Sequence, residues 1–249
     1  MDFMTLAITL LSFSLSFLFA LGGVGSALAL IPMLTWLGVP FSLARPTALF
    51  VNTVSMLGAT YSNIKARRLD YRLGLPIIAS SIVLAPVGAW CGNLLPTQYV
   101  LFVFILFLLF SGLMILFFKG GKYANQYRED RPVLGPLLVG VLSGFLSGLL
   151  GVGGGGVIAP LMLLQGFNPK RVATITAFAV PFSSFSAFLT YVMLGDFSWK
   201  ILLFAGVAAW VGGYLGTIVM HRKMRSATVK KILGVVLLLL AARLILTLV

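Results

Sequence analysis

The chain carries the same short pattern twice, in two segments that lie 128 positions apart. Residues 21–34 read LGGVGSALALIPML and residues 149–162 read LLGVGGGGVIAPLM. Each copy holds a glycine cluster, an apolar run and a proline, at Gly23, Gly25 and Pro32 and again at Gly151, Gly153 and Pro160. Weaker matches continue downstream, for example Ser55 with Ser184. Two halves of about 120 residues therefore share one structural plan.

These halves suit a membrane rather than water, because 60% of the residues are hydrophobic and only 9% are charged. Almost the whole chain lies in long apolar runs, so no soluble domain of useful size is expected. The predicted fold class is an all-α integral membrane protein. We place an N-terminal membrane repeat at 1–118, a cytoplasmic linker at 119–132 and a C-terminal membrane repeat at 133–249.

Two of the apolar runs, at 26–38 and 156–167, are too short to cross a bilayer comfortably, because a span takes roughly 17 to 25 helical residues. Each opens at a glycine cluster, so each half is predicted to begin with a Gly-broken helical hairpin, either re-entrant or fully spanning. Three transmembrane helices follow in each half. Irregular backbone is tolerated at membrane depth only inside protein or beside water. Matching broken segments in two halves are typical of a transporter site.

The basic residues predict the orientation in the membrane. The loops rich in Lys and Arg are 65–72, 119–131, 170–171 and 222–231. If these loops are cytoplasmic, 15 of the 18 Lys and Arg residues lie inside, as the positive-inside rule requires. The turn at Asp70 is then inside, whereas its counterpart at Asp196 is outside. The repeats are therefore predicted to have inverted topology in a cell inner membrane, with both termini outside the cytoplasm.

The glycine clusters are the first candidate for a binding site. Glycine lets a ligand approach the backbone, and free N–H groups at a positive helix end form an anion site. The candidate substrate-binding positions are Gly23, Gly25, Ser26, Gly153, Gly154, Gly155 and Gly156. The alternative is that these glycines only let helices pack closely. Their symmetric placement, each cluster followed by a proline, favours a ligand site.

The acidic residues indicate the charge of the ligand. All five Asp and Glu residues fall in loops or at the terminus, so no predicted span holds a carboxylate. Buried carboxylates mark proton relays and many cation sites, and a neutral or anionic solute is therefore favoured. Further candidates to bind it, on the long helices after the hairpins, are Arg45, Asn52, Ser55, Thr176 and Ser184. Arg45 fits an interfacial anchor equally well, and the hydroxyls fit bonds to backbone or across helices.

Other kinds of site find no support in the sequence. The predicted spans hold no set of nucleophile, base and orienting acid, and no cluster of metal ligands. We therefore expect neither an enzyme nor a bound metal or cofactor. The formal charge of +13 comes from short loops and reflects topology rather than nucleic-acid binding. The expected partners are the lipid bilayer and a small anionic substrate; the oligomeric state is left open, with a homodimer as one option.

The stretch GVGGGGVIAP in the second half, with its weaker copy GGVGSALALIP in the first, resembles the TauE/SafE family of membrane permeases. The resemblance covers essentially the whole chain. It places the glycines and prolines of both clusters at the positions of the family's motif, and the first copy departs from the fuller pattern at Ser26 and Ala27. The family is associated with export of sulfite and of organosulfonates such as sulfoacetate.

Together, the residues and the resemblance lead us to expect an exporter of a small sulfur-containing anion that works by alternating access. A cytoplasm-negative membrane drives an anion outward by about 2.3 kcal/mol per charge per 100 mV. The membrane potential alone can therefore drive such export. The alternatives are a passive anion channel and a permease for another small organic anion.

Overall fold

The computed structural model describes residues 3–117, 129–195, 197–223 and 226–248, and all regular structure in these ranges is helical. The helices are α1 (Phe3–Ala20), α2 (Ala27–Trp36), α3 (Phe41–Lys65), α4 (Tyr71–Leu94), α5 (Thr97–Phe117), α6 (Leu134–Leu150), α7 (Gly155–Leu164), α8 (Pro169–Leu194), α9 (Trp199–Lys223) and α10 (Ser226–Leu248). This confirms the all-α prediction. Asp196 and residues 119–128 of the predicted linker lie outside the described residues.

Glycines at matching positions break the chain between the first two helices of each half. Gly23 and Gly25 have φ of 67° and 88°, and Gly151 and Gly153 have φ of 78° and 79°. Only glycine adopts this left-handed conformation without strain. The matched glycines therefore turn α1 into α2, and α6 into α7, with similar φ angles, although the residue before α7, Gly154, is left-handed and its counterpart Ser26 is not.

Three prolines inside helices explain several polar contacts between helices. Proline has no N–H, so the carbonyl four residues earlier loses its helical hydrogen bond. Pro86 frees the carbonyl of Ile82, which accepts a hydrogen bond from Ser186 Oγ at 2.8 Å. Pro160 frees the carbonyl of Gly156, which accepts one from Ser111 Oγ at 3.4 Å. Pro181 frees the carbonyl of Ala177, which accepts one from Thr60 Oγ1 at 2.7 Å. Hydroxyls from neighbouring helices thus satisfy the carbonyls, as expected for prolines in a membrane.

The two halves are interleaved rather than stacked. The central helices α3 and α8 pack against each other, α3 also packs against α9, and α8 against α4. On the flanks α1 packs on α9 and α6 on α4, while α5 pairs with α10. The counterpart helices are α1 and α6, α3 and α8, α4 and α9, and α5 and α10. If each helix is exchanged for its counterpart, this set of contacts is unchanged.

Glycines permit the two flank contacts. On α4, a Cβ at Gly88 would collide with the carbonyl oxygen of Phe145 in α6. On α9, a Cβ at Gly212, the counterpart of Gly88, would collide with the carbonyl oxygen of Phe13 in α1. Small residues of this kind let membrane helices approach backbone to backbone.

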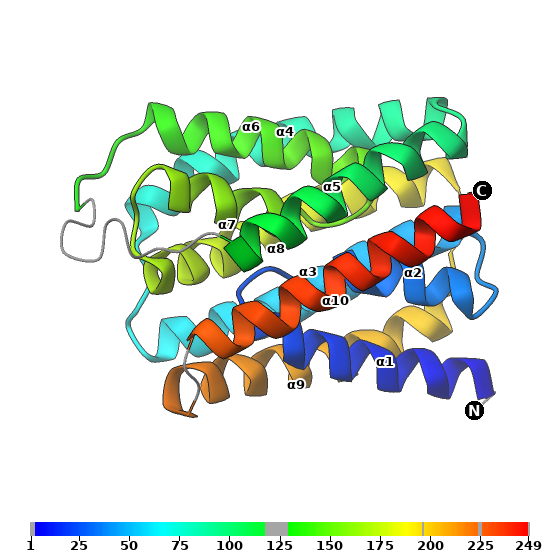
Figure 1. Ribbon diagram of the computed structural model, residues 1–249, viewed down its shortest axis with the longest axis horizontal. Helices are drawn as coiled ribbons and strands as arrows, with labels where there is room; N and C mark the ends of the chain where they lie inside the picture. Colours follow the sequence, from blue (N-terminus) through cyan, green and yellow to red (C-terminus); the bar gives the residue numbers. More distant parts are fainter. Residues whose placement is uncertain (1–2, 118–128, 196, 224–225, 249) are drawn as a thin grey trace.

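Counterpart helices run in opposite directions along the long axis of the molecule (Figure 1). In that view α1 and α3 run from right to left, whereas α6 and α8 run from left to right. The directions of α4 and α5 are likewise opposite to those of α9 and α10. Both chain termini lie at the same end, on the right of the view.

Among the described residues, four helices, α4, α5, α8 and α9, are long and apolar enough to cross a membrane. The sequence predicts six such helices. Of the other two, α3 is long enough but carries a row of buried polar residues, and the apolar stretch found in α10 is the shorter Gly234–Leu246. Large apolar side chains on the outside are more than half exposed, among them Trp90, Phe102 and Leu203. Such a surface suits lipid.

Candidate functional site

Asn52, in the middle of α3, connects the two glycine turns. Its side chain is 0% exposed. Its Oδ1 accepts a hydrogen bond from the backbone N–H of Ala27 at 3.4 Å, and its Nδ2 donates to Ser184 Oγ at 2.9 Å. One carboxamide therefore joins the start of α2, in the first half, to the middle of α8, in the second.

Both turns approach Asn52 so closely that only glycine fits. A Cβ at Gly25 would collide with Asn52 Oδ1, and a Cβ at Gly153 would collide with Asn52 Nδ2 and lie 2.8 Å from Ser184 Oγ. These two positions thus require glycine twice over, once for the left-handed backbone and once for the space that the carboxamide fills.

Backbone N–H groups beside Asn52 are available to an acceptor. The short helices α2 and α7 both begin here, so two positive helix ends meet at the same place. In the described part of the chain, no hydrogen-bond partner is recorded for the N–H groups of Gly25, Ser26, Gly153 and Gly154. The N–H of Ala27 binds Asn52 Oδ1, which stands where an anion oxygen could bind.

Buried hydroxyls add further hydrogen-bonding groups. Ser26, 0% exposed, accepts a bond from Ser16 Oγ at 3.2 Å. The hydroxyls of Ser55 and Thr176 are buried and have no partner among the described residues. An unpaired buried hydroxyl lowers the stability of the fold by about 1–3 kcal/mol. We therefore expect these two hydroxyls to bind a water molecule or a ligand.

Four of the predicted glycines do not face Asn52. Added Cβ atoms would meet Ala173 from Gly23, the carbonyl of Ser143 from Gly154, the carbonyl of Val24 from Gly155, and Leu28 and Phe107 from Gly156. At these positions the structure shows close helix packing, the alternative reading of the clusters. Of the predicted residues it brings together Gly25, Ser26, Asn52, Gly153 and Ser184.

Arg45 lies two helical turns before Asn52 and is also buried, with 6% of its surface exposed. Its Nη1 donates to Tyr191 Oη at 2.9 Å and to the carbonyl of Gly92 at 3.1 Å. A Cβ at Gly151 would come within 2.8 Å of the Arg45 side chain. The residue is therefore enclosed by protein, contrary to the anchor alternative.

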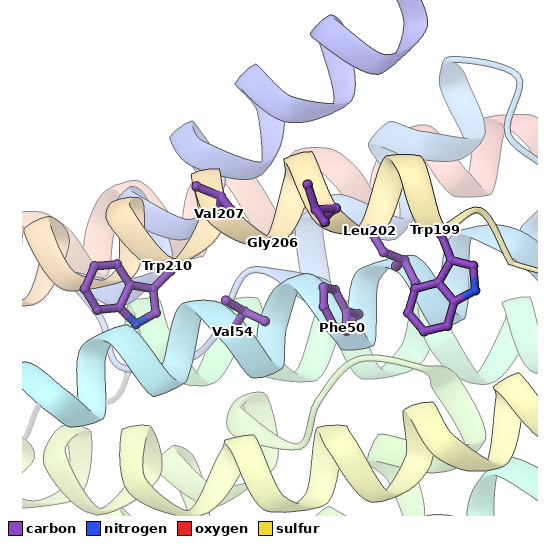
Figure 2. Close-up of a pocket in the computed structure, with 8 residues that line it drawn as sticks. Phe50, Val54, Trp199, Leu202, Gly206, Val207 and Trp210 are labelled. Atoms are coloured by element: carbon purple, nitrogen blue, oxygen red, sulfur yellow. The ribbon is translucent and has the colours of Figure 1, made fainter.

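The candidate site is closed on all sides. Every residue in 23–32 and 151–160 is buried. A groove of about 400 Å³ between α3 and α9, shown in Figure 2, lies apart from it and is lined by Phe50, Val54, Trp199, Leu202, Leu203, Gly206, Val207 and Trp210. Its walls are apolar and face the outside of the bundle, so it offers nothing to hold an anion.

One end of the molecule is basic. Asp70, the residue before α4, binds Arg171 Nε at 3.2 Å and Arg131 Nε at 3.3 Å. Partial burial raises the pKa of this carboxyl, but the guanidinium groups of Arg171 and Arg131 outweigh it and hold the pKa below its usual value. Arg67, Arg68 and Arg72 line the same hollow. Asp70 thus joins the α3–α4 connection to the segment before α6 and to the start of α8.

The ten helices of the described residues, the apolar outer surface and the buried polar centre are those of a multi-pass membrane protein of the transporter class. The family model described as "Sulfite exporter TauE/SafE" matches residues 8–244. The chain belongs to this family, which confirms the resemblance.

Relatives with curated names agree with this class. The chain is 26% identical over 90% of both sequences to "Probable membrane transporter protein YunE" of Bacillus subtilis. It is 25% identical to "Probable membrane transporter protein MJ0441" of Methanocaldococcus jannaschii, over 73% of this chain and 70% of the relative. It is 30% identical to "Sulfite exporter TauE/SafE family protein 3" of Arabidopsis thaliana, over 57% of this chain and 31% of the relative.

Sequence reasoning missed two residues of this region, Tyr191 and Ser16. Tyr191 lies seven residues after Ser184 and therefore on the same face of α8, a spacing that could have identified it. Ser16 has no such signal, because its partner Ser26 lies beyond the turn and only the folded hairpin brings the two hydroxyls together.

Proposed function

We propose that this chain exports a small sulfur-containing anion, sulfite or an organosulfonate such as sulfoacetate, by alternating access. The observation that carries the proposal is Asn52, which bridges two glycine turns with free N–H groups and two helix ends that favour negative charge. A sulfite or sulfonate group has several oxygens on one sulfur, so it can accept hydrogen bonds from both turns at once. The names of the family and of its plant relative support the substrate class.

In this proposal an oxygen of the substrate takes the place of Asn52 Oδ1. Asn52 Oδ1 releases the N–H of Ala27 to an anion oxygen, and Asn52 Nδ2 remains as a donor to the same anion. As the anion enters or leaves the site, the unpaired hydroxyls of Ser55 and Thr176 donate hydrogen bonds to it in place of the water molecules that it has lost. A carboxylate at position 52 would repel the substrate.

Alternating access follows from inverted repeats at 1–118 and 133–249, which we also infer. The opposite directions of counterpart helices in Figure 1 and the exchangeable contact pattern support this. Because each half supplies one turn beside Asn52, a tilt of one half against the other opens the site to one side and closes it to the other. The buried state of both turns favours such a carrier over an open pore.

We place the basic end in the cytoplasm and the termini outside, in the inner membrane of a cell. The support is that the Arg residues around Asp70 lie at the α3–α4 connection, at the end of the bundle away from the termini. A substrate leaving the cytoplasm then moves down the membrane potential and needs no coupling ion.

Flux from proteoliposomes tests the proposal. Sulfite, sulfoacetate, sulfate, thiosulfate and small carboxylates would be compared, with and without an imposed potential. Saturable efflux of sulfite or sulfoacetate is expected, whereas linear flux would indicate a channel and carboxylate preference a permease for organic anions. Asn52→Asp should abolish efflux. The control Asn168→Asp changes a partly exposed helix cap, where a carboxylate also accepts the N–H of Lys170, and should leave efflux unchanged.

Transport by Asn52→Asp at the rate of the unmodified protein would refute the site. Absence of transport for every sulfur-containing anion, with folded protein in the vesicles, would refute the substrate class.

A further inference from the structure

The guanidinium group of Arg45 is held without a carboxylate. Its two hydrogen bonds go to a phenol and a backbone carbonyl, and its carbon lies 4.9 Å from the ring centre of Phe41 and 4.7 Å from that of Tyr191. No Asp or Glu of the described part of the chain lies within 4.0 Å of it. Its Nε is buried and has no hydrogen-bond partner there. A buried cation of this kind is incompletely neutralised.

Arg45 and Tyr191 belong to the same interface as the candidate site. Arg45 precedes Asn52 by seven residues on α3, and Tyr191 follows Ser184 by seven on α8. Since α3 and α8 run antiparallel in Figure 1, the Arg45–Tyr191 bond lies two turns, about 10 Å, from the Asn52–Ser184 bond. It lies toward the start of α3, the end of the molecule that also holds the termini.

The second half has no arginine at the position that matches Arg45. The position that matches Arg45 in the second half is Thr174, whose hydroxyl donates to the carbonyl of Lys170. At the opposite end of this interface Arg171 of α8 pairs with Asp70. In the described residues, a buried cation without a carboxylate partner therefore lies at one end of the interface only, and an anion that moves from the glycine turns toward the end that holds the termini meets it.

We propose that Arg45 is a second, outer binding site for the oxyanion and that Tyr191 occupies it while the site is empty. The proposal rests on the proposed function. An anion oxygen binds the free Nε and displaces Tyr191 Oη from Nη1, so that the guanidinium holds the anion with two donors. Tyr191 keeps its hydrogen bond to the carbonyl of Gly148, at 2.8 Å, and stays ready to close behind the departing anion.

The test measures which charge Arg45 attracts, without any transport assay. Ser184→Cys is placed in a Cys91→Ser background, because Cys91 is a free thiol. From the side of the termini, its reaction rate is compared for a sulfonate-bearing and a trimethylammonium-bearing methanethiosulfonate reagent. A unit charge about 10 Å away, at an effective dielectric constant of about 20, changes either rate by roughly tenfold.

The sulfonate reagent is expected to react faster, and Arg45→Gln should lower the ratio of the two rates at least tenfold. Arg45→Lys, which keeps the charge, should preserve the ratio. The control Arg243→Gln should preserve it too, because Arg243 lies on α10 over the ring of Trp36, 4.3 Å from its centre. Tyr191→Phe should raise both rates several-fold, since the closing bonds to Arg45 and Gly148 are lost.

An unchanged ratio in Arg45→Gln would overturn the outer site. If that variant does not fold, unchanged rates in Tyr191→Phe would overturn the closing role and with it the proposal. A ratio that depends on Arg45, in a protein that moves no sulfur-containing anion, would support the outer anion site and refute only the proposed substrate.

Discussion

Replacing Gly153 with alanine tests whether the glycine turn and Asn52 form one unit. The added methyl group would collide with Asn52 Nδ2 and lie 2.8 Å from Ser184 Oγ. Asn52 would have to move, and its bonds to Ser184 and to the N–H of Ala27 would break. The same change also forces a side chain onto a backbone with a φ of 79°.

The expected loss of stability has two parts. A non-glycine residue in the left-handed region costs about 1–2 kcal/mol. Two lost hydrogen bonds cost about 0.5–1.5 kcal/mol each. Gly153→Ala should therefore destabilise the protein by about 2–5 kcal/mol.

Gly38→Ala is the matched control, since Gly38 has a φ of 84° and nothing lies within 4 Å of its added Cβ. It should cost only the backbone part, about 1–2 kcal/mol. Stability in detergent is measured by denaturant unfolding, and affinity by the concentration dependence of efflux. In an Asn52→Ala background the excess cost of Gly153→Ala over Gly38→Ala should largely vanish. Equal costs for the two glycines in the unmodified protein, or an excess cost that persists in the Asn52→Ala background, would refute the reasoning.

The other predictions concern topology, packing, pH and energy. Cysteines at Thr97 and Ser198 should react with an impermeant reagent from the same, external side; reaction from opposite sides would contradict inverted repeats. Thr60→Val should lower the thermal midpoint of unfolding without changing the KM of efflux, because Thr60 bonds to the Ala177 carbonyl and not to the site. Adding Pro181→Ala should restore the thermal midpoint, because alanine returns a helical N–H to that carbonyl. The ion pairs of Asp70 stabilise the protein above about pH 4, and this stabilisation is lost as the pH falls through the lowered pKa of Asp70. Asp70→Asn should therefore reduce the loss of stability that the protein shows at acid pH. An unchanged loss in the variant would contradict this prediction. Efflux should accelerate with a potential negative on the substrate side; dependence on a proton or sodium gradient instead would reveal a coupling ion.

The helical fold and the two turns were predictable because they depend on local chemistry. Apolar runs specify helices in a membrane, and a left-handed turn demands glycine, so Gly23, Gly25, Gly151 and Gly153 could be recognised from their spacing alone. Which glycine faces a ligand could not be predicted in this way. Gly153 and Gly155 are only two residues apart, yet one faces a carboxamide and the other a backbone carbonyl.

The polar residues of the central helices show the same limit. From sequence, Thr60, Ser111 and Ser186 cannot be told apart from Ser55 and Thr176, since all are hydroxyls in apolar runs. The first three fill bonds that prolines leave open on other helices, whereas the last two have no partner in the described structure. The distinction depends on contacts between segments far apart in the chain, which only the fold supplies.

Asn52 shows how two matched halves can yield a site with a single bridging group. Its counterpart in the second half, by the register that pairs Ser55 with Ser184, is Pro181. Two carboxamides reaching the same space between the glycine turns would exclude each other, so only one half can supply one. The proline at the other position frees the carbonyl of Ala177, which Thr60 of α3 then binds. At this matched pair of positions the first half therefore has Asn52, which contacts both glycine turns. The second half has Pro181, which frees the Ala177 carbonyl for the hydrogen bond that holds α8 against α3. Duplication provides the two turns, and divergence at this pair provides the link between them.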